Sequence, residues 1–132
     1  MLNIHNIDGE IVKEDDRYIV KDNTSLKNLI VSSTTLFPNK STNGHKHKGQ
    51  EEVYIFLTGN GYIYLDEKKK SVQTGDMVLI EDGVFHRVES GASGLYFVCV
   101  FDGKRYEWLE RDFWELLIHG MSLWKMTVSN IH

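Results

Sequence analysis

Short stretches of β-forming residues recur along the first hundred positions, and this spacing constrains the fold more than any other feature. Each stretch is rich in Val, Ile, Leu, Tyr or Phe, and turn-forming pairs such as Asp8-Gly9 and Asp82-Gly83 separate them. We expect strands at residues 17–21, 26–31, 53–57, 62–65, 77–80, 84–88 and 95–101. Strands about 8–12 residues apart, each with a turn signal, predict an all-β sandwich or barrel.

Three further polar or glycine-rich stretches are predicted to interrupt the strands, at residues 58–61, 66–70 and 90–94. The mixed-charge run 66–70 has two interpretations. It is a patch for an anionic ligand or, as we favour, a solvated hairpin tip. In the polar segment 32–44 the first half can extend the preceding strand, and Pro38 begins a loop.

Length and charge exclude several classes of protein. The 132 residues suit one domain, and 15 Lys and Arg against 19 Asp and Glu give a net charge of −4 with no basic stripe, which argues against a nucleic-acid partner. The longest apolar run, residues 95–101, is too short to span a membrane. With no visible signal peptide and a single cysteine, Cys99, we expect a cytoplasmic protein whose cysteine is a small buried hydrophobe.

The last 29 residues differ from the rest, so we divide the chain into a β domain, residues 1–103, and a tail, residues 104–132. Leu109, Phe113, Leu116 and Leu117 follow helical spacing, which predicts an amphipathic helix over 106–119 that ends at Gly120. All three tryptophans, Trp108, Trp114 and Trp124, lie in the tail. We favour a helix that covers one face of the β domain over a lid or a dimer contact.

Three histidines and one carboxylate have the spacing of a metal site. His45 and His47 lie on one face of an extended segment, because strand side chains alternate. Glu52 begins the strand that follows, and His86 lies in a later one. Such a nitrogen and oxygen donor set suits one divalent ion of Fe, Mn, Ni, Zn or Cu. We assign no role to His5, His119 or His132.

Two motifs resemble those of small single-domain cupins. Residues 44–59, GHKHKGQEEVYIFLTG, are similar to the first motif, and residues 75–86, GDMVLIEDGVFH, to the second. The resemblance extends over residues 28–101, although Gly44 is not in the usual leading position, Glu81 replaces the usual Pro and Ser90 an Asn. It implies an antiparallel double-stranded β-helix (jelly-roll) barrel that binds a metal inside, and a homodimer.

Within this resemblance, two neighbouring acids compete for one ligand position. Glu52 has the six-residue spacing to Gly59, whereas Glu51 has seven, and only one of them can face inward with His47. We therefore expect His45, His47, Glu52 and His86 as ligands, with positions left open for water or substrate.

Tyr54 shares the inward face of Glu52 and is our candidate acid, base or hydrogen-bond donor. The expected pocket residues are Phe56, Tyr64, Val84 and Val88, with Tyr62 and Tyr96 as further tyrosine candidates. We expect a metalloenzyme acting on a small oxygenated metabolite, a sugar or a keto or hydroxy acid, by isomerase, lyase or dioxygenase chemistry. The alternatives are a non-catalytic module that binds or senses a small ligand, and an interaction protein dominated by its tail.

Overall fold

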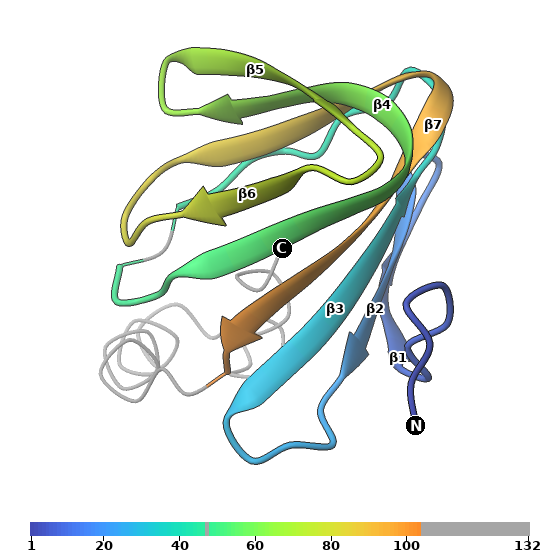
Figure 1. Cartoon of the computed structure of the whole chain (residues 1–132), viewed down its shortest axis with the longest axis vertical. Coiled ribbons are helices and arrows are strands. Elements are labelled where there is room, and N and C mark those ends of the chain that lie inside the picture. Colours follow the sequence, from blue (N-terminus) through green and yellow to red (C-terminus); the bar gives the residue numbers. More distant parts are fainter. Residues whose placement is uncertain (47, 104–132) are drawn as a thin grey trace, which may run out of the picture.

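A computed structural model describes residues 1–46 and 48–103, and these form a single antiparallel β structure (Figure 1). Its strands are Glu10–Glu14 (β1), Tyr18–Asn23 (β2), Leu29–Leu36 (β3), Glu52–Leu65 (β4), Lys68–Gln73 (β5), Met77–Ile80 (β6) and His86–Asp102 (β7). They pair in the order β1-β2-β3-β7-β4-β5, and β6 pairs with β4. The predicted all-β, antiparallel fold class is confirmed. The predicted helix at 106–119 lies outside the described residues.

Two long strands, β4 and β7, carry the chain from one layer of the structure to the other (Figure 1). We predicted breaks at 58–61 and 90–94, and these predictions are wrong: both segments are strand residues. Register shifts between Phe56 and Thr58 and between Gly59 and Gly61 bend β4 without ending it. At Gly59 the φ angle is +86°, and a side chain there would collide with the carbonyl oxygen of Gly94. Glycine therefore permits the close approach of the two paired strands at this bend.

The predicted hairpin tip at 66–70 is also corrected, because its lysines begin β5. Only Asp66 and Glu67 form the turn, where Asp66 has a φ of +51°. The Asp66 amide donates to the Phe85 carbonyl (2.8 Å), and the Phe85 amide donates to the Asp66 side chain (3.0 Å), which fixes the turn against the start of β7. Strand β1 was not predicted. The expected extension of the preceding strand beyond residue 31 is confirmed, since β3 runs to Leu36.

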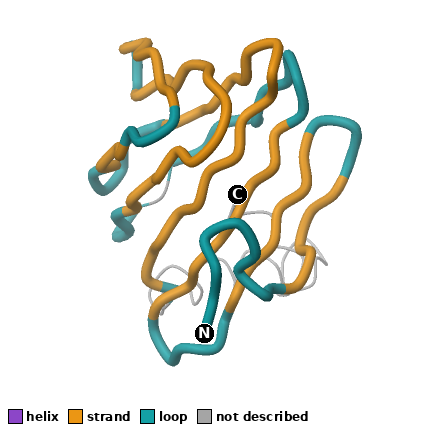
Figure 2. The backbone as a smooth tube through the Cα atoms, turned by 45° about the vertical axis from the view of Figure 1, so that its right-hand side comes forward, coloured by secondary structure: helices purple, strands orange, loops and turns teal. Residues whose placement is uncertain are grey.

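The interior lies between the two layers, as the curled course of the strands in Figure 2 shows. Its largest fully buried side chains include Phe56, Ile63, Val88 and Phe101. Tyr54, Ile80 and Phe97 belong to the same apolar cluster. This packing holds the inward-facing ends of β4 and β7 in place, and those ends carry the polar groups described next. No helix long and apolar enough to cross a bilayer occurs in residues 1–46 and 48–103.

Candidate metal centre

Three side chains that could ligate a metal ion converge from three separate segments. His45 lies in the connection between β3 and β4, Glu52 begins β4, and His86 begins β7. One ligand atom from each lies within 4.8 Å of the other two. The structure therefore brings together three of the four side chains expected from the motifs. The fourth, His47, lies outside the described residues.

Backbone pairing explains why these residues meet. His45 and His86 form an isolated antiparallel bridge, in which each amide donates to the other's carbonyl at 3.0 and 2.9 Å. The two imidazole rings consequently lie 4.4 Å apart between centroids, at an angle of 83°. Glu52 is in register with Ile80 of β6 and Phe101 of β7, so its carboxylate emerges from the apolar cluster.

The carboxylate and one imidazole are in direct contact. Nε2 of His86 lies 2.8 Å from Oε2 of Glu52, and the two side chains are only 3% and 2% exposed. The other ring nitrogen, Nδ1, lies 3.0 Å from the Val84 carbonyl oxygen. Because a carbonyl oxygen only accepts, Nδ1 must carry the proton of this hydrogen bond. In the neutral ring Nε2 then presents its lone pair to the carboxylate.

A lone pair and a carboxylate at this distance require a positive charge between them or beside them, either a proton or a metal ion. The arrangement fits a metal ion on two counts. Metal-bound histidines usually donate their second ring N–H to a carbonyl or carboxylate, as His86 does to Val84. Two ligands at about 2.1 Å from one ion, at right angles, are about 3 Å apart, close to the separation of His86 and Glu52. The donor set thus suits a divalent transition metal.

The neighbouring acid is placed differently. Glu51 is exposed, whereas Glu52 is buried, as strand alternation requires of two successive residues. Of the two carboxylates, only Glu52 lies with His45 and His86.

Tyr54, the candidate for acid, base or donor, is buried beside the cluster. Its ring lies 5.7 Å from that of His86 and stacks on Phe97 at 5.1 Å. Burial, with a smaller contribution from the Glu52 carboxylate, raises the pKa of the Tyr54 phenol well above its usual value. The group is therefore held as a neutral phenol, which can donate a hydrogen bond but is a poor base.

The four expected pocket residues occupy different environments. Phe56 and Val88 are part of the apolar core, and Val84 is packed against it at its edge. Tyr64 is not brought to the site. It lies on the outer face, with the Arg87 guanidinium 4.0 Å above its ring and its hydroxyl 3.3 Å from Glu89. The register shift after Phe56 reverses which residues of β4 face inward, so Ile63 is buried instead.

The remaining tyrosine candidates also lie away from the metal cluster. Tyr62 is 41% exposed, beneath the ammonium group of Lys69. The Tyr96 hydroxyl donates to the carbonyl of Ile4 at 2.8 Å. Cys99 is buried as expected, and burial raises the pKa of its thiol well above the ordinary value.

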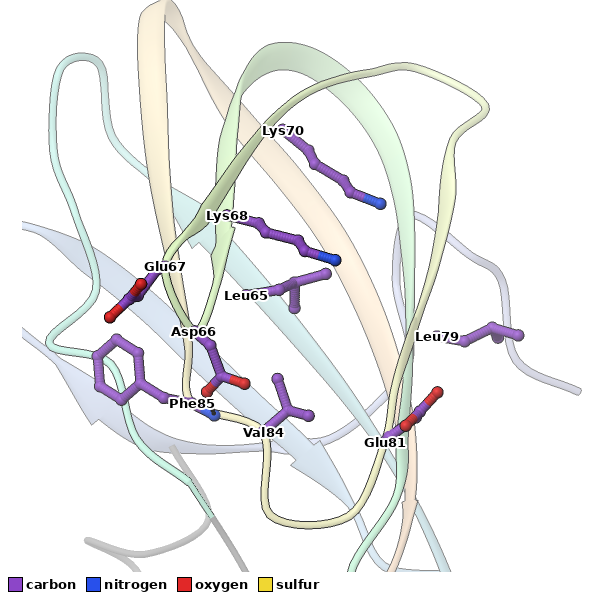
Figure 3. A pocket seen from close by; sticks show the side chains of 9 residues that line it. All are labelled: Leu65, Asp66, Glu67, Lys68, Lys70, Leu79, Glu81, Val84 and Phe85. Carbon is purple, nitrogen blue, oxygen red and sulfur yellow. Dashed lines mark hydrogen bonds between the residues drawn. The ribbon is translucent and has the colours of Figure 1, made fainter.

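A hollow of about 900 Å³ opens between the edges of β5 and β6 (Figure 3). Its walls include Leu65, Val84 and Leu79, together with Lys68 and Lys70. The three consecutive lysines of β5 were not predicted as site residues, because a run of charges favours a solvated tip. Strand alternation would have separated Lys68 and Lys70 from Lys69 only if β5 had been recognised as a strand.

Comparisons with known proteins agree with the fold. A family model for the cupin domain matches residues 33–101, just over half of the chain. A protein of Thermotoga maritima described as an oxalate-binding protein is 33% identical over 64 residues, which cover 48% of this chain and 53% of that protein. An uncharacterized protein of Methanocaldococcus jannaschii is 38% identical over 56 residues, 42% of this chain and 45% of that protein. These matches thus span only about half the length of either relative.

Solved structures share the fold over about three quarters of this chain, at lower sequence identity. The structure of KdgF from a Halomonas species matches with a TM-score of 0.65 at 12% identity, over 74% of this chain and 91% of that one. A predicted oxalate decarboxylase from Thermotoga maritima matches with a TM-score of 0.65 at 23% identity, over 77% and 97%. At such identities the likeness concerns the fold alone.

Proposed function

Because this chain belongs to the cupin family, we propose that it binds one divalent transition-metal ion through His45, Glu52 and His86 and acts on a small oxygenated metabolite. One observation carries the proposal: three donors, distant in sequence, meet within 4.8 Å, and the carboxylate among them is almost fully buried. A buried carboxylate is costly unless a cation or a proton balances it.

The protein's own residues would hold and orient the ligands. The Val84 carbonyl fixes the ring of His86, the backbone bridge to His86 fixes His45, and the strand register fixes Glu52. We propose His47 as the fourth ligand, from its place in the first motif. Bound there, the ion would polarise a carbonyl or hydroxyl group of the metabolite as a Lewis acid.

Tyr54 has a limited role in this proposal. Its ring is held between Phe97 and the ring of His86, so the phenol cannot move far from the cluster. We propose that it donates a hydrogen bond to an oxygen of the metabolite, which a neutral phenol does well.

A second candidate function is a module that binds a small ligand without converting it. Two observations favour it. One curated relative is described as an oxalate-binding protein. In addition, the aromatic contacts of Tyr54 other than His86 are apolar, namely Phe56 and Phe97, so the site offers few groups for proton transfer.

One-dimensional proton NMR of the metal-loaded protein with small keto and hydroxy acids separates the two candidate functions. An enzyme changes the metabolite signals with time, whereas a binding module only broadens or shifts them.

Elemental analysis of protein purified without chelator or histidine tag tests the proposed metal site. We expect close to one equivalent of a divalent transition metal in the natural chain and a loss of most of it in Glu52→Gln and His86→Ala. Glu51→Gln is the matched control, since it removes the neighbouring exposed carboxylate and should retain the metal. Equal metal content in all four proteins, or none in the natural chain after incubation with each candidate ion, contradicts the proposal.

A further inference from the structure

The three consecutive lysines of β5 point to two different faces. Lys69 lies on the outer face, where its ammonium is 4.2 Å from the centre of the Tyr62 ring. Lys68 and Lys70 line the hollow between β5 and β6 instead, as strand alternation requires. Figure 3 shows both side chains extending from β5 across this hollow, towards the strand that carries Leu79.

The strand register connects these two lysines with the metal centre. Lys68 is the partner of Leu65, and Leu65 is the partner of His86. These three residues form one row across β5, β4 and β7 on the inward face, so Lys68 lies two strand spacings, roughly 10 Å, from His86 between backbones. In the next row, Lys70 pairs with the buried Ile63, which in turn pairs with the buried Val88. Val84, whose carbonyl oxygen accepts a hydrogen bond from the His86 ring, also lines the hollow.

The hollow also contains the acids Asp66, Glu67 and Glu81, but none of them forms an ion pair with either lysine. Across residues 1–46 and 48–103, neither ammonium is within ion-pair distance of a carboxylate. The Asp66 carboxylate accepts a hydrogen bond from the Phe85 amide, and Glu67 points to the opposite side of the turn in Figure 3. Glu81 follows β6 on the opposite wall. Two cations without an ion-pair partner among the described residues thus project into a space whose other walls combine apolar side chains with these three acids.

Inward-facing charges on an edge strand also prevent that strand from pairing with another molecule, and β5 is at the edge of the sheet. A charge of either sign serves that purpose. Protection of an edge does not explain why Lys68 lies in the same row as His86, with Lys70 in the next row on the same face.

We propose that Lys68 and Lys70 form the anion-binding wall of the ligand site and that the ligand is a small metabolite with two acidic groups. One group would occupy the open positions at His45, Glu52 and His86, and the other would accept hydrogen bonds from the two ammonium groups. This inference rests on the proposed function, since it needs an ion at those three residues, and it narrows the metabolite from any oxygenated compound to a dianion.

Isothermal titration of the metal-loaded protein with oxalate, malonate and succinate tests the inference, with the neutral diols of equal length as probes without charge. The variant is the double substitution Lys68→Gln and Lys70→Gln, and Lys69→Gln is the matched control on the same strand. Metal content and melting temperature are measured on every sample. All three lysines are exposed, so the substitutions should leave the fold intact.

We expect at least one dicarboxylate to bind the natural chain, the double variant to bind it about tenfold or more weakly, and Lys69→Gln to stay within about twofold. Binding should weaken with added salt, and metal content should be equal in all samples. If the metal is present but the lysine substitutions change nothing, or if no dicarboxylate binds in preference to its diol, the inference about Lys68 and Lys70 is overturned. If the natural chain holds no metal, it is the proposed function that fails.

Discussion

Nε2 of His86 lies 2.8 Å from a carboxylate oxygen of Glu52, in a part of the protein where both side chains are almost completely shielded from water. The contact joins the first residue of β4 to the first residue of β7. Because Nδ1 of His86 already donates to Val84, the positive charge that this contact requires is a proton on Nε2 or a bound cation. A proton would make the contact a structural ion pair, whereas a cation would make it part of a metal site.

Removal of the metal should destabilise the protein. An ion that binds only the folded state adds about 2.7 kcal/mol when its concentration is one hundred times its Kd. For a chain of this size that corresponds to a rise of several degrees in Tm. We expect excess chelator to abolish this rise in the natural chain. A chelator-insensitive Tm, or the same metal-dependent rise in Glu52→Gln, would argue for a structural ion pair instead.

The close approach of the paired strands β4 and β7 at Gly59 should be sensitive to a single added methyl group. Gly59→Ala places a side chain against the carbonyl oxygen of Gly94, and we expect a loss of several kcal/mol in the free energy of unfolding, measured in urea. Gly75→Ala is the matched control, because Gly75 also has a positive φ, +94°, but nothing lies within 4 Å of the added carbon. It should cost only about 1 kcal/mol. An equal loss in the free energy of unfolding for both variants would show that the close approach of β4 and β7 is absent.

Cys99 should resist modification in the folded protein. Its side chain is buried in β7, and burial raises its pKa, so neither access nor thiolate is available at pH 8. We expect a thiol reagent such as Ellman's reagent to label less than about a tenth of the protein in an hour, and all of it in denaturant. Rapid labelling without denaturant would show that this part of the core opens readily.

The turn before β2 should contribute to the pH dependence of stability. Hydrogen bonds from the Arg17 side chain and amide lower the pKa of Asp15 to about 2 from 3.8. A carboxylate with a lowered pKa in the folded state stabilises the protein above pH 3.8, and this stabilisation disappears as the pH falls from 3.8 to about 2.

Urea titrations between pH 2 and 6 compare the natural chain with Asp15→Asn, which keeps the acceptor oxygen but not the charge. We expect the natural chain to be the more stable at pH 6, and the difference to vanish near pH 2. Asp16→Asn is the control, since the Asp16 side chain is 86% exposed and its ion pair with Lys40 is 3.9 Å long. An unchanged difference at every pH would contradict the ion pair of Asp15 with Arg17.

Much of this structure was predictable from local sequence patterns. Strand alternation allowed only one of Glu51 and Glu52 to face inward, motif spacing favoured Glu52, and the structure places Glu52 inside with His86. The turn at Asp66 was recognisable from residue type. The course of β4 was not, because Thr58, Gly59, Asn60 and Gly61 are typical turn residues, and only the partner strand shows that they form a bend.

That bend is also why the expected place of Tyr64 in the pocket was wrong. One additional residue in β4 reverses the faces of every residue after it, and no local pattern in the sequence reveals the bulge. Lys68 and Lys70 were missed for a related reason: three lysines are poor strand formers, and only pairing with Ile63 and Leu65 makes them a strand. The roles of His47 and of the tail at 104–132, the homodimer and the cytoplasmic location stay predictions.

The most direct measurement is an anomalous difference map from crystals of the metal-loaded protein, collected at the absorption edge of the bound metal. We predict a single strong peak about 2.0–2.3 Å from a ring nitrogen of His45, a ring nitrogen of His86 and a carboxylate oxygen of Glu52. A map with no peak among these three side chains, with His86 and Glu52 still in direct contact, would contradict the account.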